Sequence, residues 1–234
     1  MRGICLLFFP RRCPVCDGIL PVGKGKICGG CYNKLNFIAE PRCKKCGKQI
    51  DSKEEEYCRD CRTKKHYYDR GISLIENKGE GKSSVYAIKY RNKREYAEFY
   101  ADEIKIRYEY EISLWGANLM IPVPLHKKKL RKRGYNQAKV IADDLGEKLL
   151  IPVKEKALSR IKNTIPLKTL HGEERKKCLK DAFVADTALV KGKVVVLVDD
   201  IYTTGSTIDE CSKELISKGA SKVYFITISI GEGM

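Results

Sequence analysis

The sequence of 234 residues contains no long apolar run. None of its hydrophobic stretches reaches the ~18 residues that a membrane-spanning helix requires, so we predict no membrane span. The run Ile4–Phe9 follows a basic start, as in a signal peptide, but it is short and no small-residue cleavage site follows it. We interpret it as an amphipathic segment that packs on the folded body, and we expect a cytoplasmic protein.

Acidic residues are scarce relative to basic ones. The chain has 30 Asp and Glu against 46 Lys and Arg, which gives a formal net charge of +16. A strongly basic protein of this kind suits nucleic acids, nucleotides and other phosphates. The alternative is a lysine-rich surface that has no such ligand.

A secretion signal is lacking, and this decides how the 11 cysteines are interpreted. Disulfides persist in oxidising compartments, so in a cytoplasmic chain metal binding is favoured. Three cysteines stand at irregular positions, namely Cys5, Cys178 and Cys211, and we expect these to be small buried apolar residues.

The other eight cysteines form four C-x-x-C pairs, and 11 residues separate each pair from the next. Two such turns supply the four thiolates of a tetrahedral zinc site, so the set predicts two structural zinc ions with no open position for catalysis. The ligands are Cys13, Cys16, Cys28, Cys31, Cys43, Cys46, Cys58 and Cys61. Sequential pairing, as in a double zinc ribbon, is favoured over a cross-brace. We place this module at residues 1–66 and expect His66 to be a surface residue.

From residue 67 to 234 the pattern becomes that of an α/β domain. Val194–Val198 is a short apolar run rich in β-branched residues, Thr207–Lys218 has helical periodicity, and Val223–Ile228 is a second apolar run. Strand, helix and strand in this order predict a parallel sheet. Before them we predict a strand at 71–76, a turn at 77–81, one or two helices to about 106, a strand at 117–123 and a helix at 136–150.

The segment after the apolar run at 194–198 carries the chemistry. Asp199 and Asp200 follow the predicted strand, and Thr203, Thr204, Gly205, Ser206 and Thr207 open the next helix. Free backbone N–H groups and hydroxyls at a helix start bind an anion such as phosphate. Two carboxylates beside a phosphate would repel it, so they suit sugar hydroxyls or a magnesium-coordinated sugar.

This segment resembles the signature of class I phosphoribosyltransferases that binds 5-phosphoribosyl 1-pyrophosphate (PRPP). The resemblance implies that Asp199 and Asp200 hold the ribose hydroxyls and that Thr203–Thr207 holds the 5′-phosphate. It also implies magnesium as the companion of the ligand.

Further motifs make nearly the whole chain similar to the ComF family of competence proteins. They are the Cys pairs, Lys89-Tyr90-Arg91, Ile121-Pro122-Val123-Pro124-Leu125-His126 and Arg133-Gly134-Tyr135-Asn136-Gln137-Ala138. The resemblance implies a role in natural transformation, with single-stranded DNA and DNA-uptake or recombination proteins as partners. The chain departs from the family at Ile165, where a Gln is common, and at Cys178, where an Asn is common.

The segment His126–Arg133 is strongly basic, and we expect a loop. In class I transferases this region meets the pyrophosphate, so Arg133 is a candidate for stabilising its departure. The neighbouring candidates for pyrophosphate or DNA are Lys127, Lys128, Lys129, Arg131, Lys132 and Tyr135. Tyr135 would stack on a base if the ligand were DNA. A solvated charged loop is the third possibility.

Two hypotheses of function follow. The first is a transferase of phosphoribosyl from Mg-PRPP to an unidentified acceptor. The alternative is a non-enzymatic module that binds single-stranded DNA through the basic loop and zinc ribbons, with a repurposed sugar-phosphate pocket.

Overall fold

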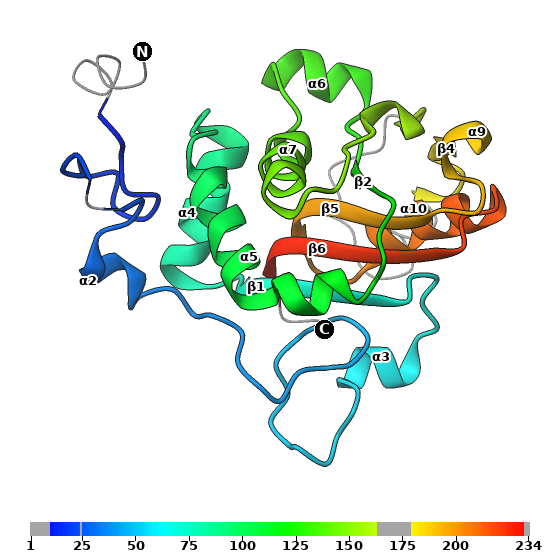
Figure 1. Cartoon of the computed structure of the whole chain (residues 1–234), viewed down its shortest axis with the longest axis horizontal. Coiled ribbons are helices and arrows are strands. Elements are labelled where there is room, and N and C mark those ends of the chain that lie inside the picture. The colour runs from blue at the N-terminus through cyan, green and yellow to red at the C-terminus, as the bar shows by residue number, and fades with distance from the viewer. Residues whose placement is uncertain (1–9, 24, 163–178, 232–234) are drawn as a thin grey trace.

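A computed structural model describes residues 10–23, 25–162 and 179–231 of the chain (Figure 1). Two short helices lie in the cysteine-rich part, α2 (Gly29–Tyr32) and α3 (Arg59–Thr63). The other helices are α4 (Gly79–Tyr90), α5 (Tyr96–Ser113), α6 (Lys127–Arg133), α7 (Gln137–Leu149), the 3-10 turn η1 (Glu155–Ala157), α9 (Thr187–Val190) and α10 (Ser206–Ser217). The strands are β1 (Arg70–Glu76), β2 (Leu119–Pro122), β3 (Leu158–Arg160), β4 (Phe183–Ala185), β5 (Val194–Tyr202) and β6 (Lys222–Ile230).

Four strands form one parallel sheet in the order β1-β6-β5-β2. This confirms the predicted α/β fold with a parallel sheet. Strands β5 and β6 are neighbours joined through α10, as the apolar runs at 194–198 and 223–228 indicated. The short strands β3 and β4 pair with each other in antiparallel fashion beside this sheet.

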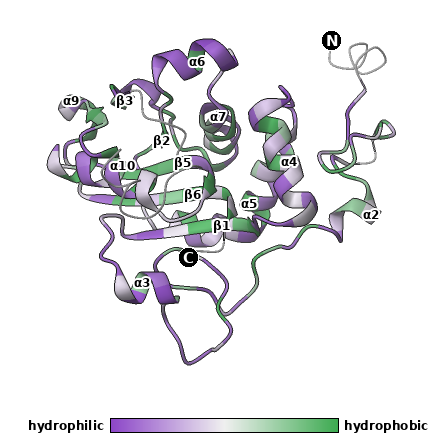
Figure 2. Cartoon of the chain, turned by 180° about the vertical axis from the view of Figure 1, so that it is seen from behind, coloured by the Kyte–Doolittle hydropathy of each residue, from purple (hydrophilic) through white to green (hydrophobic). Residues whose placement is uncertain are grey.

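The two faces of the sheet bury different helices. On β5, Val196 and Val198 face the apolar cluster that α4, α5 and α7 build. Val195 and Leu197 face the opposite cluster, which includes Ile208 and other residues of α10. Because alternate residues of a strand point to opposite faces, a strand buried on both sides is apolar throughout, and Figure 2 shows this central sheet in the hydrophobic colour.

Two predicted boundaries and one predicted element type are wrong. The turn expected at 77–81 already contains the start of α4 at Gly79. Strand β5 does not stop at Val198 but continues through Tyr202, so both aspartates are part of the strand. The basic segment is a helix, α6, and not a loop; His126 caps its start, since its side chain accepts a hydrogen bond from the backbone N–H of Lys128.

The cysteine-rich part forms two separate ribbons, which meet the rest of the chain in different places (Figure 1). The first, residues 13–31, lies beside α4 and α5. The second, residues 43–61, lies against β1 and carries α3. Among the described residues, no helix combines the length and the apolar character needed to cross a bilayer.

Candidate functional site: a phosphate loop beside an acidic pair

The acidic pair lies at the carboxyl end of β5, where ligands of parallel sheets bind. Asp200 is buried, and its carboxylate accepts hydrogen bonds from Lys89 Nζ at 2.8 Å and from Gln137 Nε2 at 3.4 Å. Asp199 is half-buried and accepts the backbone N–H of Asp200 at 2.8 Å. Lys89 and Gln137 stood in the sequence motifs without an assigned role, and their contacts with Asp200 come only from the fold.

The pKa values of the two carboxyl groups are shifted in opposite directions. Burial, and then the charge of Asp200, raise the pKa of Asp199 well above its usual value. Burial also opposes the charge on Asp200, but the Lys89 ammonium holds the pKa of Asp200 below its usual value. A ligand that brings positive charge or hydroxyl donors to this edge would therefore favour the charged form of Asp199.

The loop Thr203–Thr207 follows directly and leads into α10. Gly205 occupies the N-cap position with φ of 78°, and no side chain caps the helix. The first amide groups of a helix without such a cap are available to an anion. The hydroxyls of Thr204 and Ser206 lie 3.0 Å apart on the same loop, and the residues from 201 to 208 line a small cavity.

Gly205 is required by its surroundings as well as by its backbone angle. A Cβ atom at this position would lie 2.4 Å from the Tyr202 hydroxyl, closer than side-chain atoms approach one another. The Tyr202 ring is stacked on Phe225 at 4.9 Å, so it cannot move aside easily. The loop is therefore shaped around the Tyr202 ring.

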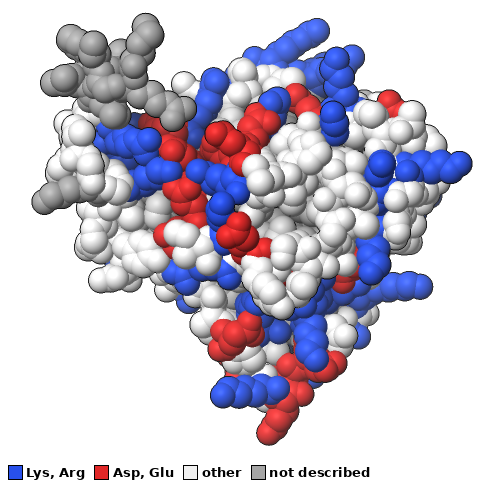
Figure 3. All heavy atoms as spheres, viewed as in Figure 1, with Lys and Arg blue, Asp and Glu red and all other residues white. Residues whose placement is uncertain are grey.

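Arg133 reaches the acidic pair through one intermediate residue. Its guanidinium donates to the side-chain oxygen of Gln137, whose amide nitrogen faces Asp200. It also lies over the Tyr90 ring at 5.2 Å. The helix α6 thus brings its last residue toward the donor site, while the basic side chains of Lys127, Lys128, Arg131 and Lys132 are exposed (Figure 3).

Tyr135, which was expected to stack on a base if the ligand were DNA, is not exposed in the structure. Tyr135 is buried, and its hydroxyl donates to the carbonyl of Ile88. The guanidinium of Arg94 covers the ring at 4.2 Å. Tyr135 therefore fixes α4 against the turn before α7.

The eight cysteines form two groups, 13/16/28/31 and 43/46/58/61, in which all four sulfur atoms lie within 4.8 Å of one another. This confirms sequential pairing. The separations Cys13–Cys28 and Cys46–Cys58 are both 3.7 Å. A tetrahedron with Zn–S bonds of about 2.3 Å has edges of about 3.8 Å, so each group fits a zinc ion. Of the three remaining cysteines, Cys211 is buried as expected, while Cys5 and Cys178 lie outside the described residues.

Tyr68 connects the second ribbon to the phosphate loop, since Lys45 of this ribbon lies over the Tyr68 ring at 5.3 Å. Tyr68 is packed at 4.8 Å against Phe225, and its hydroxyl lies 2.8 Å from that of Tyr202. His66 was expected at the surface, but it is buried: it stacks on Tyr68 and its Nδ1 lies 2.7 Å from Asp209 on α10. Asp209 is 143 positions away from His66 in the sequence, so nothing local signals this contact.

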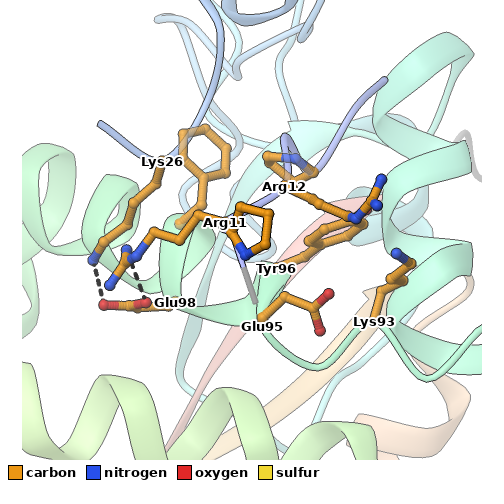
Figure 4. Close-up of a pocket in the computed structure, with 10 residues that line it drawn as sticks. Arg11, Arg12, Lys26, Lys93, Glu95, Tyr96 and Glu98 are labelled. Carbon is orange, nitrogen blue, oxygen red and sulfur yellow. Dashed lines mark ion pairs between the residues drawn. The ribbon is translucent and has the colours of Figure 1, made fainter. Parts of the chain in front are cut away.

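A wider cavity lies elsewhere, between the first ribbon and α5, with a volume of about 570 Å³ (Figure 4). Its cations are matched by carboxylates. Lys26 and Arg11 both pair with Glu98, and Lys93 pairs with Asp17. Because its walls are internally neutralised, this cavity is a poor site for a phosphate ligand.

The substitutions at Ile165 and Cys178 lie outside the described residues, so their consequence for the acceptor side stays a prediction.

Two family models match the chain. Residues 4–62 match the double zinc ribbon domain, and residues 130–229 match the phosphoribosyl transferase domain.

The curated relatives cover most of the chain. Competence protein F of Haemophilus influenzae is 29% identical over 92% of this chain and 95% of its own length. Competence protein ComFC of Bacillus subtilis is 25% identical over 87% of this chain and 83% of its own. Over most of its length, the chain is thus similar to the ComF and ComFC competence proteins.

Other relatives of the chain carry a different name. DNA utilization protein YhgH of Escherichia coli K12 is 25% identical over 93% of this chain and 96% of its own. Among solved structures, a purine phosphoribosyltransferase from Pyrococcus horikoshii Ot3 matches with a TM-score of 0.35 and 19% identity, over 56% of this chain and 73% of that chain. The family models, and not this distant superposition, carry the assignment of the domains.

Proposed function

We propose that this protein binds Mg-PRPP, or a related phosphoribosyl compound, and serves the use of incoming DNA in natural competence. The observation that carries the proposal is the arrangement at the end of β5. The carboxylates of Asp199 and Asp200 stand beside the uncapped start of α10, with Lys89 fixing Asp200 at 2.8 Å. The names of the relatives in Haemophilus, Bacillus and Escherichia support the biological role.

Each part of the ligand has a matching group in this arrangement. The ribose hydroxyls would donate to Asp199 and Asp200, and the 5′-phosphate would accept from the amides and hydroxyls of Thr203–Thr207. Magnesium, bound with the ligand, would supply positive charge beside the carboxylates.

Transfer would break the bond between C1′ of the ribose and the pyrophosphate oxygen and form a bond from C1′ to the acceptor. Negative charge then grows on the departing pyrophosphate, and cations placed there lower the barrier. Arg133 and the other cations of α6 are our candidates for this role. Excluding water from the site would keep water from attacking the electron-poor C1′ in place of the acceptor.

Calorimetry tests the binding step. We expect saturable, magnesium-dependent binding of PRPP to the zinc-loaded protein. The binding should be lost in the double variant Asp199→Asn/Asp200→Asn. The matched control is Asp143→Asn, since Asp143 is exposed on α7 and pairs only with Lys139 in the salt bridges of the described residues. Unchanged binding in the double variant would refute the assignment.

A non-enzymatic DNA-binding role is the second candidate, favoured by the exposed cations of α6. The two roles differ in what happens to PRPP. A transferase releases pyrophosphate when it is supplied with its acceptor, whereas a binding module leaves PRPP intact with single-stranded DNA present. A binding module also loses DNA affinity steeply as salt is added.

A further inference from the structure

The four cysteines of the first zinc site differ in their access to solvent. Cys13 and Cys31 are buried, at 0% and 5% exposure, whereas Cys28 is half-buried and Cys16 is exposed. Gly18 stands beside the Cys16 sulfur, since a Cβ atom at this position would lie 3.3 Å from it. Because glycine has no side chain, position 18 leaves the sulfur uncovered. Small molecules in the solvent therefore reach one ligand of this site.

The second zinc site is shielded. Three of its ligands are no more than 8% exposed, and the fourth, Cys61, is half-buried and packs against the main core. The hairpins around the two sites are otherwise alike, since position 18 in the first and position 48 in the second accept the same backbone hydrogen bond from the first ligand. The chain thus holds two sites of the same chemistry with different access to solvent.

Access and thiolate character together decide how readily a cysteine is oxidised. A cysteine that binds zinc is a thiolate, so all eight ligands have the second property. Of these eight, all of which the structure describes, Cys16 alone is exposed and has both. The sulfur of Cys28 lies 3.9 Å from that of Cys16, so a second thiolate is in place to react with an oxidised Cys16.

We propose that Cys16 is a site of reversible oxidation by hydrogen peroxide, and that its oxidation releases the first zinc ion and frees the first ribbon from α5. The Cys16 thiolate attacks one peroxide oxygen, the O–O bond breaks, and a sulfenic acid and hydroxide form. The Cys28 thiolate then attacks the Cys16 sulfur, which forms a disulfide and expels a second hydroxide. Two electrons pass from the two sulfurs to the peroxide. Half of the thiolate ligands are then lost, so the ion leaves.

Loss of the ion reaches α5 through residues beside the ligands. Val15 stands between the first two ligands, and Ile27 directly precedes Cys28. Both pack against the apolar cluster of α4 and α5. Without zinc the ribbon loses the folding energy that fixes these two side chains in place. The proposal does not rest on PRPP binding, because no described residue of the first ribbon lines the cavity at residues 201–208.

The test follows zinc in the full-length protein, loaded with both ions and treated with hydrogen peroxide. The chelating dye pyridylazoresorcinol should record one zinc ion leaving at least about tenfold faster than the other. Alkylation of the remaining thiols and peptide mapping should find Cys16 and Cys28 oxidised first. Hydrogen exchange should then become faster in residues 13–31 and stay unchanged in residues 43–61. A thiol reductant with added zinc should restore the original exchange.

Two variants separate the access of the sulfur from the presence of the site. Cys16→His keeps a fourth ligand for zinc but has no sulfur to oxidise, so the fast release should become at least about fivefold slower. Cys61→His makes the same replacement at the least buried ligand of the second site and should leave the fast release unchanged. Zinc content before oxidation shows that each variant holds both ions, and the peptide map of wild type decides the question without them.

The proposal is overturned if both ions leave wild type at the same rate or if cysteines of the second site are oxidised first. Fast release that persists in Cys16→His would overturn it as well. So would slow hydrogen exchange in residues 13–31 after the first ion has left.

Discussion

The two zinc ribbons have the same ligand spacing but are held to the protein in different ways. The sulfurs of the second site belong to the main core: Cys43 and Cys46 are 1% and 2% exposed and share a cluster with strands β2, β5 and β6. In the first site Cys16 is exposed, and the buried residues form a small cluster of their own. Equal motifs therefore do not imply equal structural roles.

The contacts between ribbon and domain explain the difference. The backbone of the second ribbon is fixed to β1, since Gly71 N–H donates to the Lys45 carbonyl at 2.8 Å. A Cβ at Gly47 would lie only 2.6 Å from the Gly71 carbonyl oxygen, so the ribbon backbone and the β1 backbone are in close contact. The first ribbon meets α5 beside a cavity, through side-chain ion pairs, which Figure 3 shows as adjacent red and blue spheres, and through Val15 and Ile27, which pack on the apolar cluster of α4 and α5.

The largest expected effect comes from removing each zinc site in turn. Cys43→Ser/Cys46→Ser should lower stability by about 5 kcal/mol or more, which corresponds to a fall in Tm of about 10 °C or more. Cys13→Ser/Cys16→Ser should leave the main transition within a few degrees of wild type. Differential scanning calorimetry, with zinc content measured in parallel, checks both. Equal losses in the two variants would contradict the comparison.

A smaller effect is expected from two tyrosine hydroxyls that lie after the ribbons in the sequence, Tyr68 after the second and Tyr32 after the first. Tyr68→Phe removes the buried partner of the Tyr202 hydroxyl, at a cost of about 1–3 kcal/mol. Because Tyr202 shapes the phosphate loop, PRPP affinity should fall about three- to tenfold. Tyr32→Phe is the matched control after the first ribbon. It loses contacts to Glu103 and Arg107, and PRPP affinity should not change.

The docking of the first ribbon should depend on Lys26, which pairs with Glu98 and Asp102 on α5. We expect Lys26→Ala to weaken docking by about 0.5–1 kcal/mol and to speed hydrogen exchange in residues 13–31. Added salt should act in the same direction. Lys44→Ala removes an exposed pair within the second ribbon and should leave exchange unchanged.

The contribution of the Lys26–Asp102 ion pair to docking of the first ribbon should also depend on pH. Burial raises the pKa of Asp102, but hydrogen bonds from Lys148 and Lys26 outweigh it and hold the pKa below its usual value. A carboxyl group with a depressed folded pKa stabilises the fold above its unfolded pKa, so the contribution is lost only as pH falls below about 4. Fast exchange of residues 13–31 already at pH 6 would contradict this.

The smallest effect is expected at Asp144 on α7, close to the same ion-pair cluster. Burial, with the nearby Glu98 charge, raises the pKa of Asp144 to about 6. Its charged form is therefore disfavoured in the fold, and the cost grows between the unfolded pKa of about 4 and this value and is complete above it. Asp144→Asn should stabilise the protein by about 1 kcal/mol at pH 8, after allowance for solvent screening, and by less at pH 5. A constant difference in Tm across this range would count against it.

The sequence predicted the features whose signals are local. The apolar run 194–198, the Asp-Asp pair and the repeat of cysteine pairs each carry their meaning within a few residues, and the strand, the loop and both sulfur clusters were found from them. The helix α6 was missed because seven residues with a single apolar side chain, Leu130, show no helical stripe. Its capping residues, His126 and Gly134, were the available signal.

The missed contacts join distant parts of the chain. Lys89 meets Asp200 across 111 positions, and His66 meets Asp209 across 143. Partners of this kind follow from the topology of the sheet and not from spacing. The boundary between residues 66 and 67 stays a prediction, because the two family models end at 62 and begin at 130.

The central claim is that the donor site depends on the second ribbon and not on the first. The most direct test is to titrate Mg-PRPP into the Cys13→Ser/Cys16→Ser variant, loaded with zinc at its remaining site, beside wild type. We predict dissociation constants that agree within about twofold. Loss of binding in this variant, with its remaining zinc in place, would contradict the account.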